Sequence, residues 1–235
     1  MPIVWLIALI GQSTCPADLV ENVCKMKNIG CNNKPPSDKF DGNGYELMYG
    51  TFLMPLAQLE KPRIFEIGLG CDMAYGPGAS ARTWRKAFPH AILWEADIDH
   101  KCIKHHQPIL TSLGIRGLSG SQENETHVRR WIHQFGGARF DAIIDDGSHT
   151  NGAIMKSFKL LWPSVKPGGR YFVEDMCAGR RFPWADGNPV PIDIFSYWMN
   201  QASLASEPPN RSPNRTPHGP LGVSVVPPSC TAHHD

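Results

Sequence analysis

The sequence predicts an α/β fold, a Rossmann-like, doubly wound and mainly parallel sheet that is incomplete at its carboxyl-terminal strands. Two observations predict it. Short runs of apolar residues that end in glycine or acidic residues alternate with longer segments whose apolar residues recur every three to four positions. Runs that are apolar throughout are typical of strands buried on both faces, as in a parallel sheet between layers of helices.

Composition places the chain among soluble globular proteins. It has 235 residues, of which 41% are hydrophobic and 19% charged, and a net charge of +1. Basic residues are not clustered, so we expect no nucleic-acid partner. The seven cysteines form no CxxC pair or zinc-ligand spacing, and their odd number argues against a complete disulfide framework. Oligomeric state is left open by these data.

Three regions are predicted along the chain. Residues 1–36 form an apolar segment and a linker, residues 37–205 form the Rossmann-like domain, and residues 206–235 form a tail with seven of the 21 prolines, which we expect to be disordered. The apolar run Ile3–Ile10 is too short for a stable membrane span. If the run is a signal peptide the protein enters the secretory pathway, and otherwise it is cytoplasmic; no basic residue precedes it.

Five strands and their connecting helices follow from the pattern of apolar runs. A helix through Met48 and Leu56 ends before Pro62. The predicted strands are a run from Arg63 into the glycines that end at Gly70, Ala91–Asp97, a segment near Gly114–Gly120, a run from Phe140 to the adjacent carboxylates Asp145 and Asp146, and a run from Tyr171 to Glu174 and Asp175. A helix over Thr150–Trp162 joins the last two strands, and Pro191–Ser203 is predicted to form one more helix.

Four carboxylates follow the last two strands, and the topology brings them to one edge. Asp145 and Asp146 end one strand, and Glu174 and Asp175 end the other. Parallel strands joined by a helix place their carboxyl ends on the same side of the sheet, where such folds bind ligands. Carboxylates so close repel one another unless a cation or hydrogen-bond donors compensate them, and a hard divalent metal is the natural partner.

A structural reading of the same residues is open. Asp146 or Ser148 could cap the following helix, and Glu174 and Asp175 could pair with Arg180 or Arg181. The complete set, with His149 three residues after Asp146, favours a functional site.

A glycine-rich loop follows the first strand in Glu66-Ile-Gly-Leu-Gly70. Glycine lets the backbone turn tightly and approach a ligand closely. The dinucleotide fingerprint GxGxxG is broken at Met73, which disfavours a nicotinamide dehydrogenase. Asp97 ends the second strand, where such folds bind ribose hydroxyls; the alternative is a cap for the helix predicted over His100–Gln107.

Together these motifs resemble the class I S-adenosylmethionine-dependent methyltransferases. Within that class they resemble the metal-dependent sugar O-methyltransferases of the macrocin and mycinamicin type and their eukaryotic relatives. The likeness covers roughly residues 37–176 and rests on Phe65-Glu-Ile-Gly-Leu-Gly70, Ile144-Asp-Asp-Gly-Ser-His149, Lys166-Pro-Gly-Gly169 and Val173-Glu-Asp175. Asp38-Lys39 and Gly44-Tyr45 resemble the entry motif of that group.

The resemblance implies a role for each matching residue. S-adenosylmethionine would be bound by Glu66, Gly68, Gly70, Asp97, Gln122 and Asp145. A divalent metal such as Mg²⁺ would be held by Asp146, Glu174 and Asp175, and His149 would be the general base on the acceptor hydroxyl. The implied acceptor is a hydroxyl of a small molecule or glycan.

The chemistry agrees with this arrangement, because a sugar hydroxyl is a poor nucleophile until its proton is removed, and histidine accepts protons near neutral pH. Folds of this type normally continue with further strands, which the proline-rich tail is not expected to supply. The alternative function is therefore a non-catalytic or truncated relative that binds a nucleoside cofactor or a protein partner.

Overall fold

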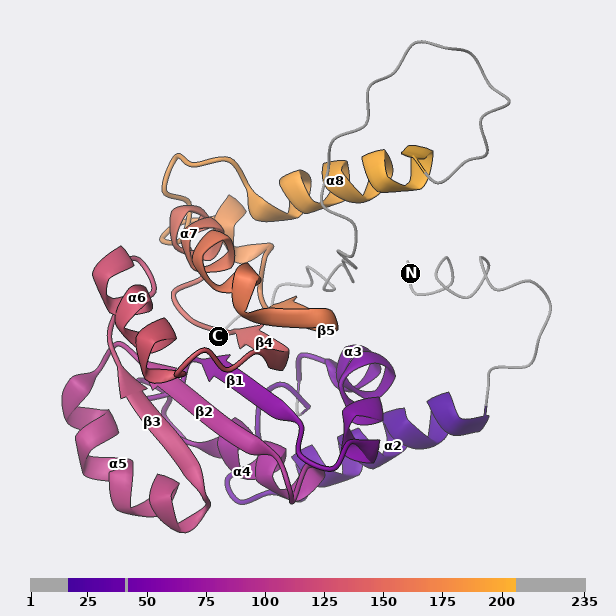
Figure 1. Ribbon diagram of the computed structural model, residues 1–235, viewed down its shortest axis with the longest axis vertical. Helices are drawn as coiled ribbons and strands as arrows, with labels where there is room; N and C mark the ends of the chain where they lie inside the picture. Colours follow the sequence, from indigo (N-terminus) through magenta and orange to yellow (C-terminus); the bar gives the residue numbers. More distant parts are fainter. Residues whose placement is uncertain (1–16, 41, 206–235) are drawn as a thin grey trace.

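The structure, a computed structural model, describes residues 17–40 and 42–205 (Figure 1). Its centre is one sheet of five parallel strands in the order β3-β2-β1-β4-β5. The strands are β1 (Arg63–Ile67), β2 (Ile92–Asp97), β3 (Ile115–Ser119), β4 (Phe140–Asp145) and β5 (Val165–Val173). The predicted parallel α/β sheet is thus confirmed. The strand order reverses between β1 and β4, and this switch point opens a crevice at the carboxyl ends of the strands.

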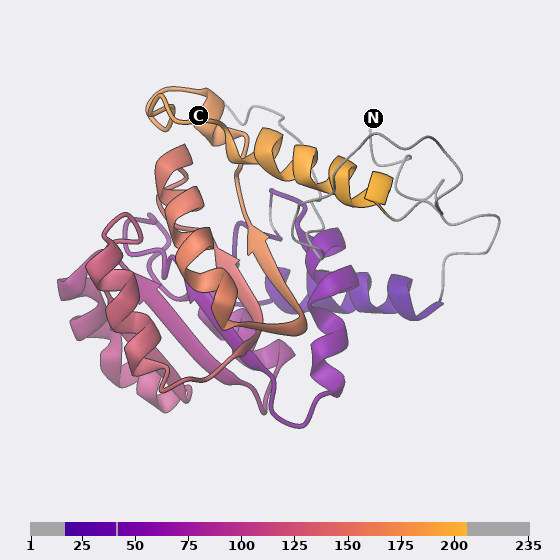
Figure 2. The same ribbon diagram turned by 45° about the horizontal axis from the view of Figure 1, so that its top comes forward.

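Helices cover both faces of this sheet (Figures 1 and 2). One face packs against α2 (Ala17–Cys31), α3 (Glu46–Phe52), α4 (Ala79–Ala87) and α5 (His100–Ser112). The other face packs against α6 (Glu125–Gln134) and α7 (Asn151–Leu161), and α8 (Pro191–Ala205) lies beside α7. Short 3₁₀ turns are η1 (Met54–Gln58), η2 (Trp162–Ser164) and η3 (Ala178–Arg180).

Each inner strand contributes side chains to both cores, which explains why the strands lack polar alternation. In β1, Ile64 belongs to the core under α2–α5, and its neighbour Phe65 belongs to the core under α6 and α7. Both side chains are buried. In β4, Ile144 and Ile143 divide in the same way. Burial on both faces favours consecutive apolar residues, as in other parallel sheets that helices cover.

The expected linker is wrong for residues 17–31, which form helix α2. Met26 of this helix is fully buried in the core that α3 and α4 also contact. Lys27 pairs with Glu46 of α3 at 2.9 Å. The many polar residues of α2 lie on its outer side and hid its apolar stripe from the sequence reading.

Strand β5 begins at Val165, before the strand predicted from Tyr171, and includes Lys166–Gly169; its register against β4 shifts between Phe140 and Ala142. The helix predicted from Pro191 is present as α8. The apolar run at residues 3–10 and the predicted tail at 206–235 lie outside the described residues, so these assignments stay predictions. None of the described helices has the length and apolar character needed to cross a membrane.

Candidate active site

A cleft of about 1170 Å³ lies at the carboxyl ends of the strands, between the loops that follow them. Seven of the ten predicted site residues line this cleft: Gly68, Gly70, Asp97, Gln122, Asp146, His149 and Asp175. The other three, Glu66, Asp145 and Glu174, are at most 2% exposed and are not among the lining residues. The sequence therefore located the cleft correctly, and the structure divides its residues into an exposed and a buried group.

Gly68 brings the loop after β1 into contact with the loop after β4. Its φ angle is +108°, and a Cβ atom at this position would lie 2.0 Å from the backbone oxygen of Asp146. The Asp146 amide in turn donates a hydrogen bond to the Ile67 carbonyl at 2.9 Å. Only glycine fits this close approach, so the glycine-rich loop positions Asp146 as well as the floor of the cleft.

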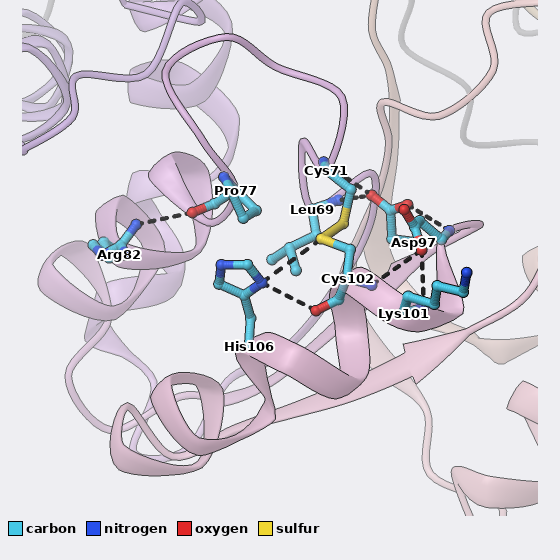
Figure 3. Close-up of a disulfide and its surroundings, with 9 residues drawn as sticks. Leu69, Cys71, Pro77, Arg82, Asp97, Lys101, Cys102 and His106 are labelled. Carbon is cyan, nitrogen blue, oxygen red and sulfur yellow. Dashed lines mark hydrogen bonds between the residues drawn. A yellow bond between two sulfur atoms is a disulfide. The ribbon is translucent and has the colours of Figure 1, made fainter.

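The side chain of Asp97 holds the loop after β1 by accepting hydrogen bonds from backbone amides of that loop (Figure 3). Its Oδ2 atom accepts from the amides of Leu69 at 3.1 Å and Cys71 at 3.4 Å, and its Oδ1 accepts from Asp99 at 2.9 Å. Burial raises the pKa of Asp97, and these amide donors oppose the rise. The alternative of a helix cap is wrong for Asp97, since Asp99 caps α5 by accepting from Lys101 and Cys102. The carboxylate of Asp97 is thus presented to the cleft.

Asp145 acts on the cleft through Gln122. It accepts hydrogen bonds from Gln122 at 2.8 Å, from the Ser157 hydroxyl and from Tyr171 at 3.2 Å. Burial raises the pKa of Asp145, and the Ser157 and Gln122 donors oppose this. The Oε1 atom of Gln122 accepts from the Ser148 amide at 2.9 Å. Asp145 therefore fixes a cleft-lining amide, and its own role in cofactor binding stays a prediction.

The buried acids surround a lysine that the sequence reading did not place in the site. Lys39 is 2% exposed, and its Nζ atom pairs with Asp146, with Glu174 at 2.8 Å and with Glu66 at 3.4 Å. Burial opposes the charge of Lys39, but the three carboxylates outweigh it and raise its pKa well above the ordinary value. Glu66 also accepts from Ser80 and from the Trp84 indole, each at 2.8 Å. Lys39 is thus an internal counter-ion for three acids from three different strand ends.

Two tyrosines of the same amino-terminal region complete the buried network. The Tyr49 hydroxyl donates to Glu174, and the Tyr45 hydroxyl donates to Asp175 at 2.7 Å. Tyr45 also accepts from the Asp175 amide at 3.1 Å. Burial and the neighbouring carboxylates raise the pKa of both tyrosines, which therefore remain protonated donors. Glu174 is buried and accepts from Lys39 and Tyr49 below the cleft, whereas one oxygen of Asp175 accepts from Tyr45 and the other lies 3.9 Å from His149 Nε2.

Asp146, His149 and Asp175 form an open group that faces the cleft. One ligand atom of each lies within 4.8 Å of the others. The Nε2 atom of His149 is 3.9 Å from a carboxylate oxygen of Asp146 and from one of Asp175. His149 and Asp175 have φ angles of 57° and 49°, a region that non-glycine residues rarely adopt. Backbone strain of this kind is concentrated at functional sites.

Asp146 and Asp175 of this open group fit a hard divalent cation, because their carboxylates lie close together and both line the cleft. The predicted ligand set of Asp146, Glu174 and Asp175 is only partly reproduced in the geometry. Asp146 and Asp175 lie together at the cleft, whereas Glu174 belongs to a second group with Glu66 and Asp146 that surrounds Lys39. The role of Glu174 as a metal ligand stays a prediction.

The alternative structural roles predicted for these acids, pairing with arginine and capping of a helix, are wrong, because those groups have other partners. Arg180 pairs with Asp193 at 2.5 Å, not with Glu174 or Asp175. At the start of α7 the N-cap residue Thr150 makes no side-chain capping bond, and the Gly152 amide donates instead to Asp186 at 2.7 Å. Neither the arginines nor the helix amides therefore compensate the strand-end acids.

The sequence reading missed Lys39, Tyr45 and Tyr49 as site residues. Lys39 and Tyr45 belong to the entry motif quoted for the resemblance, but no role was assigned to them. Tyr49 follows Tyr45 by four residues, so both project from the same side of α3. A single lysine far from the acids in sequence carries no signal of its own, because the contact of Lys39 with Asp146 spans 107 residues.

Comparison with known proteins follows this geometry. No protein-family model matches the chain. Mycinamicin VI 2''-O-methyltransferase of Micromonospora griseorubida is 37% identical over 177 residues, which are 71% of this chain and 42% of that protein. Demethylmacrocin O-methyltransferase of Streptomyces fradiae is 34% identical over 178 residues, with the same coverage of 71% and 42%. The chain thus spans less than half the length of these curated relatives.

Solved structures agree with these relatives. The MycE methyltransferase of the mycinamycin pathway, in complex with Mg, SAH and mycinamycin VI, superposes with a TM-score of 0.64 at 24% identity, over 89% of this chain and 51% of that one. A second crystal form of MycE, with Mg and SAH, has a TM-score of 0.63 at 26% identity, over 95% and 57%. The chain has the class I methyltransferase fold and is homologous to sugar O-methyltransferases.

The resemblance drawn from the motifs is therefore confirmed at the level of fold and homology. In this methyltransferase fold the crevice at the switch point between β1 and β4 is the ligand site that the topology predicts. The glycine-rich loop and Asp97 form one part of the cleft, and Asp146, His149 and Asp175 form the other. The cleft thus has two adjacent parts, one bordered by the loop after β1 and one by the ends of β4 and β5.

Proposed function

We propose that this protein is an O-methyltransferase that transfers the methyl group of S-adenosylmethionine to a hydroxyl of a sugar or other small molecule, with help from a divalent metal. The observation that carries the proposal is the open group of Asp146, His149 and Asp175 beside the glycine-rich loop in one cleft. The names of the curated relatives support a sugar hydroxyl as the acceptor class. Because the chain matches less than half of each relative, activity and acceptor need direct measurement.

The donor would occupy the part of the cleft formed by the loop after β1 and the ends of β2 and β3. Gly68 and Gly70 would allow close approach of the backbone, Asp97 would accept from the ribose hydroxyls, and Gln122 would lie near the cofactor. Glu66 and Asp145 would support these contacts from below, since both are buried. The donor subsite therefore depends on polar groups that other buried groups keep in place.

The metal would be held by Asp146 and Asp175 at the cleft, with Glu174 as the third predicted ligand. A divalent cation bound there polarises and orients the acceptor hydroxyl. His149 would accept the hydroxyl proton through Nε2, because this imidazole lies beside both carboxylates and faces the cleft. The remaining work of the protein is to align the hydroxyl oxygen with the donor methyl group and to exclude water.

Calorimetric titration of the purified chain tests the donor proposal first. We expect S-adenosylhomocysteine, the demethylated product, to bind with measurable heat, and Mg²⁺ to bind in a separate titration. In a screen of glycosylated acceptors, we expect transfer of a labelled methyl group to require Mg²⁺. Absence of heat with both S-adenosylmethionine and S-adenosylhomocysteine, with and without Mg²⁺, would remove the proposal. Binding without any transfer would point instead to the non-catalytic relative.

Metal binding is expected to weaken as the pH falls. Burial raises the pKa of Asp146 to about 6, against the opposing effect of Lys39 and His149. Protonation blocks a carboxylate as a metal ligand, so the apparent affinity for Mg²⁺ should be constant above this pKa and should decrease by about tenfold per pH unit below it. Titrations with MgCl₂ at pH 8, 7, 6 and 5 check this. An affinity that stays constant down to pH 5 would contradict the assignment of Asp146.

A further inference from the structure

A disulfide between Cys71 and Cys102 joins the two segments that border Asp97 (Figure 3). Cys71 lies in the loop after β1, directly after Gly70, and Cys102 lies in the first turn of α5. Their Cα atoms are 6.0 Å apart, and 31 positions separate them in sequence. The sequence reading did not predict this pair. It is a covalent connection between two different loops of the same cleft.

The disulfide and Asp97 both connect the loop after β1 with the start of α5. Asp97 accepts from the Leu69 and Cys71 amides on one side and from the Asp99 amide on the other. Asp99 in turn accepts from the Cys102 amide at 3.0 Å. The disulfide therefore closes a ring that runs from Cys71 through Asp97 and Asp99 to Cys102. In this ring the hydrogen bond from the Cys71 amide to Asp97 is long, at 3.4 Å, so the disulfide is the stronger restraint.

The loop beyond Cys71 has few other restraints on its position. Asp72, Met73 and Tyr75 are exposed, and all three line the cleft. Besides turns within it, this loop is held by the Gly78 amide, which donates to the Leu69 carbonyl, by the Arg82 guanidinium, which donates to the Pro77 carbonyl at 3.1 Å, and by the Tyr75 hydroxyl, which donates to Asp38 at 2.9 Å. Opposite it, Ile98 and Asp99 line the cleft beside Cys102. The distance between these two borders is therefore set largely by the disulfide.

We propose that Cys71 and Cys102 are positioning residues for the methyl donor, and that donor binding depends on the redox state of their disulfide. This inference rests on the proposed function, because the segments joined are those assigned to the donor. Reduction by a dithiol breaks the S–S bond, transfers two electrons and two protons to form two thiols, and converts the dithiol to its own disulfide. The loop after β1 can then move away from α5. Donor binding must order this loop again, and the lost conformational entropy weakens the binding.

The chemical setting permits such exchange. Cys71 lines the cleft, so a small dithiol can reach this sulfur when the donor subsite is empty. The Nδ1 atom of His106 lies 3.8 Å from the sulfur of Cys102 and 3.0 Å from its carbonyl oxygen (Figure 3). A bound donor would cover Cys71. By linkage, if the oxidised protein binds the donor more tightly, the donor protects the disulfide by the same factor.

The first experiment measures S-adenosylhomocysteine binding by calorimetry for the oxidised wild type, for Cys71→Ser, for Cys102→Ser and for the double variant. We expect the dissociation constant to rise about tenfold in all three variants, with no change in Mg²⁺ affinity. The matched control is Cys24→Ser with Cys31→Ser, which removes two exposed free thiols. This control should bind S-adenosylhomocysteine as the wild type does.

The second experiment keeps the inference testable if a variant does not fold. The wild type is equilibrated in dithiothreitol buffers of graded potential, with and without S-adenosylhomocysteine, then alkylated, and the Cys71 and Cys102 peptides are quantified by mass spectrometry. We expect the ligand to shift the dithiol-to-disulfide ratio at half reduction by about tenfold. Equal ratios, or equal affinity of oxidised and variant proteins, would overturn the inference. If the oxidised wild type does not bind S-adenosylhomocysteine at all, the proposed function has failed instead.

Discussion

Asp146→Asn is expected to lower the affinity for Mg²⁺ by more than about a hundredfold, since changes even in groups that only support a metal ligand cost 10–100-fold. The substitution preserves the volume of the side chain and removes one of the two carboxylates of the open group. S-adenosylhomocysteine should still bind, because Asp146 is not among the residues proposed to hold the donor. Turnover with any acceptor found in the screen should be lost. Parallel titrations with MgCl₂ and S-adenosylhomocysteine measure the two affinities separately.

Two comparison variants make this result specific. Asp193→Asn changes an exposed acid that pairs with Arg180 outside the cleft lining, and it should leave both affinities unchanged. His149→Gln should reduce turnover by about 10²–10⁴ while Mg²⁺ still binds, as expected for a general base. If His149→Gln weakens Mg²⁺ binding as much as Asp146→Asn does, then His149 is a metal ligand and another group removes the hydroxyl proton.

Lys39→Met is expected to destabilise the protein by about 3–5 kcal/mol at pH 8, the usual cost of removing one partner of a buried ion pair. Methionine fills a similar volume but leaves Glu66, Asp146 and Glu174 without their counter-ion. Burial raises the pKa values of Asp146 and Glu174, so these two acids can regain neutrality by binding protons, and the destabilisation should be smaller at pH 5 than at pH 8. Urea unfolding followed by circular dichroism at both pH values gives the difference in free energy of unfolding.

Lys27→Met provides the matched control for Lys39→Met. Lys27 also pairs with a glutamate at 2.9 Å, but its side chain is 57% exposed. Water screens such a pair, so its loss should change the free energy of unfolding very little. Equal effects of the two substitutions would show that Lys39 is not the internal counter-ion. A second consequence follows for the site, since Asp146 without Lys39 should bind protons more readily and Mg²⁺ should bind more weakly at neutral pH.

The sequence was sufficient to predict the sheet and to locate the cleft. Strands buried on both faces contain consecutive apolar residues, such as Ile64 and Phe65 of β1, and this signal is local. Parallel topology then brings the ends of β4 and β5 to one edge without any knowledge of side-chain packing. For this reason Asp146, His149 and Asp175 could be predicted to lie near one another, and they do.

Only the tertiary structure decided which partner each acid has. The choice of Lys39 over Arg180 as the counter-ion of Glu174 depends on how the amino-terminal region folds back under the cleft, over 135 residues of sequence. Helix α2 was read as a linker because its polar outer side obscured the residues that it buries. The Cys71–Cys102 bridge likewise depends on two loops that meet in space. Local periodicity predicts elements and their ends, whereas pairing between distant side chains is determined by packing, which a single sequence does not record.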